Sequence, residues 1–148
     1  MKVTKIDKLM ISGISAITNN EAEFSEEGGK IPALWDEYFQ KDIYKKTFNK
    51  AHEAHMYGVY SEYESDDSAD YKITVGVEVT KPKNAIIIDN QKYLVFTKKG
   101  EIPDVVVELW TEIWEHFNSD EAKYERAFKV DFEKYLSEDE IEIYISIN

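Results

Sequence analysis

Between residues 128 and 147, apolar side chains recur at every second position in two runs that a short acidic turn separates. Alternation with a period of two predicts two β-strands, each with one buried face. The opposite faces carry Glu133 with Tyr135 and Glu142 with Tyr144. A carboxylate beside aromatic rings suits a cationic, partly apolar ligand, but a solvated sheet face is the plainer alternative.

Two other segments show the helical period. Apolar residues at i, i+3, i+4, i+7 and i+8 predict an amphipathic helix over residues 31–39, and the same spacing predicts a longer helix over residues 102–117. Pro32 and Pro103 stand where a first-turn proline is tolerated. Each helix therefore offers one apolar face to a sheet.

Further runs rich in β-branched and aromatic residues predict the remaining strands. We expect strands at residues 2–18, 56–64, 71–79, 85–89 and 93–98. The polar run Asp89-Asn90-Gln91-Lys92 is read as a turn between the last two.

The order strand, helix, strand, strand occurs twice, in halves of approximately residues 1–80 and 85–148. Leu34-Trp35-Asp36-Glu37-Tyr38-Phe39 also echoes Leu109-Trp110-Thr111-Glu112-Ile113-Trp114. We therefore expect a duplicated βαββ unit. Each unit has one helix to cover one face of its sheet, so we predict one α+β domain over residues 1–148 in which the two units pair their sheets. Its antiparallel sheet carries two main helices on one side, and a groove lies between the halves.

The net charge of −12 changes the list of partners, since acidic residues are spread along the whole chain. Such a surface disfavours direct binding to nucleic acid and to anionic membranes, and it attracts cations. No apolar run approaches the roughly 20 residues that cross a bilayer, so we expect a cytoplasmic protein. The chain has no cysteine, and His52 and His55 are three rather than four positions apart. We therefore expect no metal site and no cofactor.

The duplicated order, the Trp-rich second helix, Tyr57-Gly58-Val59-Tyr60 and the closing pair of strands carry a family resemblance. The segment Phe132-Glu133-Lys134-Tyr135, followed by Ile141-Glu142-Ile143-Tyr144-Ile145-Ser146-Ile147, weighs most. The chain resembles the GyrI-like effector-binding domain family of AraC-type bacterial transcription activators. It is similar to the stand-alone members, since no helix-turn-helix segment stands within residues 1–148.

The resemblance implies a two-layer α+β domain with pseudo-twofold symmetry, whose groove between the halves holds small molecules that are often cationic and lipophilic. The family's polar anchor is a glutamate, which matches Glu133. The candidate ligand-binding residues around it are aromatic: Tyr57, Tyr60, Trp110, Trp114 and Tyr144. Tyr57 and Tyr60 point to opposite strand faces, so we expect at most one of them in the groove. The two tryptophans lie on an apolar helix face and are equally suited to the core.

A binding protein for cationic, aromatic small molecules is therefore the favoured function. The first alternative is a hydrolase of the type that opens strained cyclopropane rings, with Glu133 as general base and a hydroxyl such as that of Tyr135 donating a proton. The second is a protein-interaction role, with gyrase or a DNA-binding regulator as partner. The same residue types serve binding and hydrolysis, so the sequence leaves these alternatives open.

Overall fold

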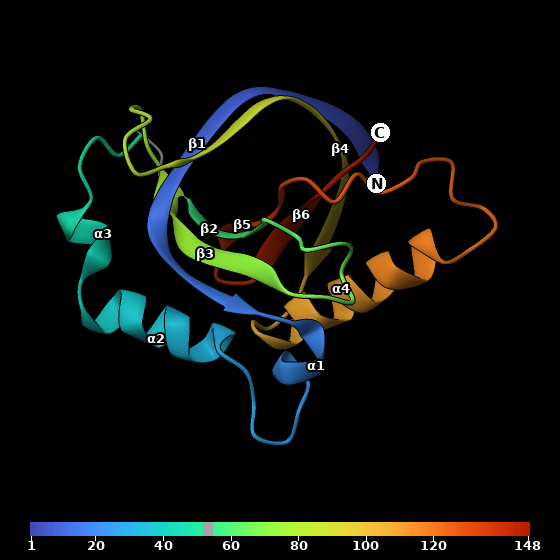
Figure 1. The fold of residues 1–148 in the computed structure, drawn as a ribbon, viewed down its shortest axis with the longest axis horizontal. Helices are drawn as coiled ribbons and strands as arrows, with labels where there is room; N and C mark the ends of the chain where they lie inside the picture. The colour runs from blue at the N-terminus through green and yellow to red at the C-terminus, as the bar shows by residue number, and fades with distance from the viewer. Residues whose placement is uncertain (52–54) are drawn as a thin grey trace.

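The computed structural model describes residues 1–51 and 55–148 (Figure 1). Its elements follow in the order β1 (Lys2–Thr18), α1 (Asn20–Glu23), α2 (Ile31–Gln40), α3 (Ile43–Lys46), β2 (Met56–Ser61), β3 (Tyr71–Glu78), β4 (Ile86–Lys99), α4 (Asp104–Phe117), β5 (Asp131–Ser137) and β6 (Glu140–Ser146). The expected α+β fold and the repeated strand, helix, strand, strand order are confirmed. Of the two histidines considered as metal ligands, His52 lies outside the described residues.

The six strands form one antiparallel sheet that closes on itself as a barrel in the order β1-β3-β2-β5-β6-β4. Each half contributes a run of three neighbours, β1-β3-β2 and β4-β6-β5. The halves join where β1 pairs with β4 and where β2 pairs with β5. This order is symmetric under exchange of the halves, which is the pseudo-twofold arrangement expected from the duplication.

Closure gives the sheet an enclosed face and an outward face, and each has its own core. The long strands β1 and β4 arch over the enclosed face, whereas α2 and α4 lie together along the other side (Figure 1). The enclosed core contains Leu9, Ile11, Tyr57, Val59, Ile88, Tyr93, Val95 and Phe132. Leu34, Tyr38, Leu109 and Ile113 of the two helices pack on the outward face, against strand residues that include Val75 and Ile143. Each strand therefore buries side chains on both faces.

Two local predictions are wrong. Residues 89–92 do not turn the chain, because β4 runs through them from Ile86 to Lys99. Asn90 adopts a left-handed backbone (φ 48°), yet the pairing with β1 keeps the same register on both sides of it, from Lys8–Asp89 to Ile6–Gln91, so the strand continues without a turn. Phe128, predicted to share a strand face with Phe132, precedes β5 and has φ 51°.

The start of α2 depends on a side chain from outside the helix. Lys30 at its N-cap makes no side-chain cap, and Glu23 takes over this role. The Glu23 carboxylate accepts hydrogen bonds from the backbone N–H groups of Lys30 (2.8 Å) and Ile31 (3.1 Å), and from the Thr18 hydroxyl. Unsatisfied N–H groups at a helix start favour such an anionic partner. Glu23 thus ties the end of β1 to the helix that forms one wall of the cavity described next.

Within residues 1–51 and 55–148, no helix combines the length and the apolar character that crossing a membrane requires.

Candidate functional site

A cavity of about 900 Å³ lies between α2 and α4, over the outward face of β2 and β5. Both halves of the chain line it. Its walls and floor are mainly aromatic and aliphatic, with Trp35 and Phe39 from α2, Val106, Trp110 and Trp114 from α4, and Met56, Tyr60 and Tyr135 from the strands. A hollow of this size between two helices is a suitable place for a small molecule.

Glu133 is one of the charged residues that line this cavity, which also include Arg126, and its side chain is almost completely buried, at 3% exposure. Its Oε2 atom accepts hydrogen bonds from the Tyr60 hydroxyl (2.8 Å) and from the indole Nε1–H of Trp110 (2.8 Å). Its Oε1 atom accepts one from the Tyr135 hydroxyl (2.8 Å). Three neutral donors from β2, α4 and β5 therefore hold the carboxylate in one orientation.

Burial and hydrogen bonding act on Glu133 in opposite directions. Burial raises the pKa of its carboxyl group above the ordinary value, and the three hydrogen bonds partly offset that rise by stabilising the ionised form. Burial also raises the pKa of Tyr60 and Tyr135 well above the usual range, and the neighbouring Glu133 charge adds to this rise. Both tyrosines therefore remain protonated donors at neutral pH.

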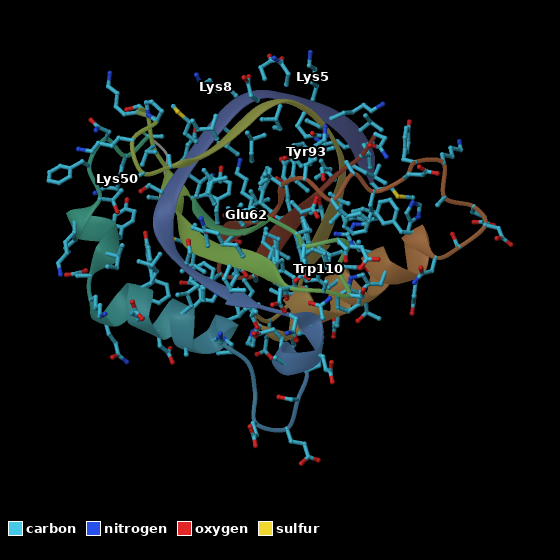
Figure 2. The ribbon with its side chains drawn as sticks, in the orientation of Figure 1. Lys5, Lys8, Lys50, Glu62, Tyr93 and Trp110 are labelled. Carbon is cyan, nitrogen blue, oxygen red and sulfur yellow. The ribbon has the colours of Figure 1, made fainter. Side chains whose placement is uncertain are left out.

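The register between β2 and β5 brings these groups together. Gly58 pairs with Glu133, so the two residues lie on the same face, and Tyr60 follows two positions later on that face. Trp110 reaches the carboxylate from α4, and Figure 2 labels this residue beside that helix. Tyr60 and Trp110 also meet edge to face, with ring centroids 5.2 Å apart, which fixes both donors.

All three tryptophans of the chain line the cavity. Trp35 meets the ring of Tyr135 edge to face at 5.4 Å, and Trp110 lies 5.9 Å from Trp114. Trp35 was not among the predicted site residues. The internal repeat could have identified Trp35, because Leu34-Trp35 matches Leu109-Trp110. The equivalent residue of the other half is expected to line the same groove from the opposite side.

The structure brings Glu133, Tyr60, Trp110, Trp114 and Tyr135 together at the cavity. It does not bring Tyr57 and Tyr144 there, which corrects that part of the predicted set. Both lie against the enclosed core, where their rings contact Phe132 at centroid distances of 5.7 Å and 4.4 Å. Tyr144 pairs with Phe132 in the β5–β6 register and therefore shares its face, whereas Glu133 shares a face with Ile143.

A second polar cluster, centred on Asp131, was not predicted from the sequence. Its members Tyr63, Asp67 and Arg126 line the cavity, whereas Asp131 is not among the lining residues. Asp131 is fully buried and accepts hydrogen bonds from Arg126 Nη2 (2.8 Å) and from the hydroxyl of Tyr63 (2.6 Å). Its other oxygen accepts from the backbone N–H and the hydroxyl of Ser146. Arg126, with a side chain only 6% exposed, also binds Asp67 (2.8 Å). The ion pair with Arg126 neutralises the charge of Asp131. Of the two buried acids of β5, Asp131 therefore has a basic partner, whereas Glu133 has none within the described residues.

Groups of three or more metal-ligating side chains do not occur among the residues that the structure describes.

Similarity to known proteins extends over nearly the whole chain. Residues 2–147 match the family model Cass2, an integron-associated effector binding protein. YobU of Bacillus subtilis (strain 168), named as a proposed transcriptional regulator, is 31% identical over 140 residues, which cover 90% of this chain and 84% of YobU. Among solved structures, an integron cassette protein from the mobile metagenome of Vibrio cholerae has a TM-score of 0.87 at 27% identity, covering 99% of this chain and 95% of that chain.

A second solved structure, that of SAV2435, has a TM-score of 0.78 at 16% identity, and the match covers 99% of this chain and 93% of that chain. At this identity the likeness concerns the fold alone. The resemblance to GyrI-like effector-binding proteins is confirmed by these relatives together with the family match. The chain therefore belongs to the Cass2 family of integron-associated effector binding proteins, which has a GyrI-like fold.

Proposed function

We propose that this protein binds a lipophilic organic cation in the cavity between α2 and α4, and that Glu133 neutralises the charge of the ligand. One observation carries the proposal: Glu133 is buried with neutral donors only, and no ion pair joins it to a basic side chain within residues 1–51 and 55–148. A buried carboxylate without a counter-charge is costly. A bound cation supplies the missing charge.

The walls fit the remainder of such a ligand. Trp35, Trp110 and Trp114 offer ring faces and edges on two sides of the cavity. Each good contact between a cation and an aromatic face contributes about 0.5–2 kcal/mol. Its volume of about 900 Å³ admits a ligand with several rings. The structure of SAV2435, which shares the fold, was determined with tetraphenylphosphonium bound, and this supports a cation of that class for the present chain.

Isothermal titration of the protein with tetraphenylphosphonium tests the proposal. Saturable binding by the wild type, weakened in Glu133→Gln, is the expected result. Glu142→Gln is the matched control, because it makes the same change on β6, where Glu142 pairs with Lys134 and bonds to Tyr144, away from the cavity. Equal affinity in the wild type and Glu133→Gln would remove Glu133 as the anchor.

Hydrolysis remains a second candidate because one atom of Glu133 favours it. Its Oε1 accepts one hydrogen bond, from Tyr135, and so keeps a lone pair for a water molecule. A general base needs such an open position. Incubation with a cyclopropane-containing alkylating compound, followed by mass spectrometry, separates the roles, since a hydrolase adds the mass of one water and a binder returns the compound unchanged. The predicted roles of gyrase and of a DNA-binding regulator as partners stay predictions.

A further inference from the structure

Gly58 occupies a position where a glycine is unexpected. It lies in the middle of β2, between Tyr57 and Val59, where glycine weakens a strand. Its backbone is not among those with a positive φ, which occur at Gly28 and Gly100, so an L-residue fits its conformation. The need for glycine at this position must therefore come from what surrounds its Cα atom.

The surroundings of Gly58 are the site itself. A Cβ atom built there would lie 2.6 Å from Oε1 and 3.5 Å from Cδ of Glu133, and 3.7 Å from Cζ2 of Trp35. The first distance is closer than real Cβ atoms approach other atoms. The carboxylate of Glu133 therefore occupies the space that a side chain at position 58 would take.

The other glycines of the sheet serve a different purpose. Gly13 and Gly76 pair with each other across β1 and β3, and a Cβ atom on either would collide with the backbone of the facing strand. Those two glycines permit close approach of two strands. The three nearest atoms at Gly58 all belong to side chains of the cavity. This contrast separates a requirement of the sheet from a requirement of the binding site.

We infer that Gly58 is a positioning residue, which determines where the anchoring charge lies by leaving the space in which the Glu133 carboxylate rests against β2. In that place Oε2 meets both Tyr60 and Trp110, and Oε1 meets Tyr135. A methyl group at position 58 displaces the carboxylate from at least one of these donors. The ionised form then loses stabilisation, and the charge no longer lies where the aromatic walls direct a cation. The inference deepens the proposed function and rests on it for its binding consequence.

A double-mutant cycle tests the inference, using Gly58→Ala, Glu133→Ala and the double variant. The urea unfolding midpoint and the Kd for tetraphenylphosphonium are measured for each protein. We expect Gly58→Ala to lower the midpoint and to weaken binding by about tenfold or more, the equivalent of one lost charged hydrogen bond. In the Glu133→Ala background, the same substitution should no longer lower the midpoint or weaken binding, because the colliding carboxylate is gone and alanine suits a strand better than glycine. Ser61→Ala on the same strand is the control for a small change in β2, because the Ser61 hydroxyl makes no hydrogen bond to any residue that the structure describes.

Equal losses from Gly58→Ala in both backgrounds, or none in either, overturn the inference, since the glycine would then act independently of Glu133. If Gly58→Ala alone does not fold, the double variant decides: a folded double variant supports the inference, and an unfolded one overturns it. If the wild type binds no tetraphenylphosphonium, the proposed ligand class fails, and the coupling of the two unfolding midpoints still decides whether Gly58 positions Glu133.

Discussion

Replacing Glu133 by Gln removes the charge at the cavity floor while keeping the side-chain volume. The carboxylate is already buried in the free protein, so the cost of removing it from water belongs to folding and does not oppose ligand binding. At about 6 Å from the centre of a bulky cation, with an effective dielectric constant of about 20, its attraction is worth about 3 kcal/mol. Glu133→Gln is therefore expected to raise the Kd for tetraphenylphosphonium about a hundredfold.

The pH dependence of stability and of ligand affinity provides a second, independent test of the role of Glu133. Because burial raises the pKa of Glu133, the folded free protein holds a proton on this group more readily than the unfolded chain does. Its contribution to stability is thus fully present below the unfolded pKa and is lost as the pH rises through the folded pKa. Affinity for a permanent cation runs the other way, since it rises with pH as Glu133 ionises. Tyr60 and Tyr135, whose pKa values are raised, do not titrate in this range.

Isothermal titration with tetraphenylphosphonium and urea unfolding of the free protein, both between about pH 4.5 and 8, measure the two slopes around the ordinary range of a glutamate. The ligand itself does not titrate there. Opposite slopes in the wild type that both disappear in Glu133→Gln are the expected outcome. An affinity independent of pH in the wild type, or a loss below threefold in the variant, would refute the assignment of Glu133 as the anchoring charge.

Three further predictions concern Trp110 in the cavity, Tyr57 in the enclosed core and Arg126 beside Asp131. Trp110→Phe removes the indole donor to Oε2 and should weaken tetraphenylphosphonium binding about tenfold, the value of one charged hydrogen bond, as measured by titration; a smaller loss than in Trp114→Phe would contradict this. Tyr57→Phe should leave the Kd within about twofold, because its ring faces the enclosed core; a larger change would place it in the site. Arg126→Met leaves Asp131 buried without its cation and should lower the free energy of unfolding by about 3–5 kcal/mol in urea titrations; a loss below about 1 kcal/mol would show that Tyr63 and Ser146 suffice.

Local periodicity was enough to predict α2, α4 and most of the strands, but it divided β4 into two strands and did not predict the short helices α1 and α3. The spacing of apolar residues in a helix or strand depends on which of its sides faces a core, and a run of consecutive residues is enough to show that spacing. Asn90 marks the limit of prediction from local sequence, because an asparagine with a left-handed backbone suits a turn and here lies within a continuous strand. Only the pairing of β4 with β1, more than 80 residues apart, decides between them.

The candidate site was predictable to the same extent. Alternation within β5 placed Glu133 and Tyr135 on one face, and the family resemblance selected Glu133. Alternation could not tell which face of β6 joins them, so Tyr144 was assigned to the cavity although its partner across the strands is Phe132. Arg126 escaped notice because its bond to Asp131 depends on the irregular chain between them, including the left-handed Phe128.

The pairing of β2 with β5 also has a consequence for the order of events when the chain folds. Gly58 and Glu133 are paired across the two strands although they are 75 positions apart in the sequence. Closing such a long loop costs conformational entropy before the contacts that stabilise it can form. Trp110 and Tyr135 belong to the same half as Glu133, so the step that requires the two halves to join is the meeting of the carboxylate with the Tyr60 hydroxyl of β2. A ligand that needs this constellation recognises the finished molecule and neither half alone, so it shifts the global folding equilibrium by mass action.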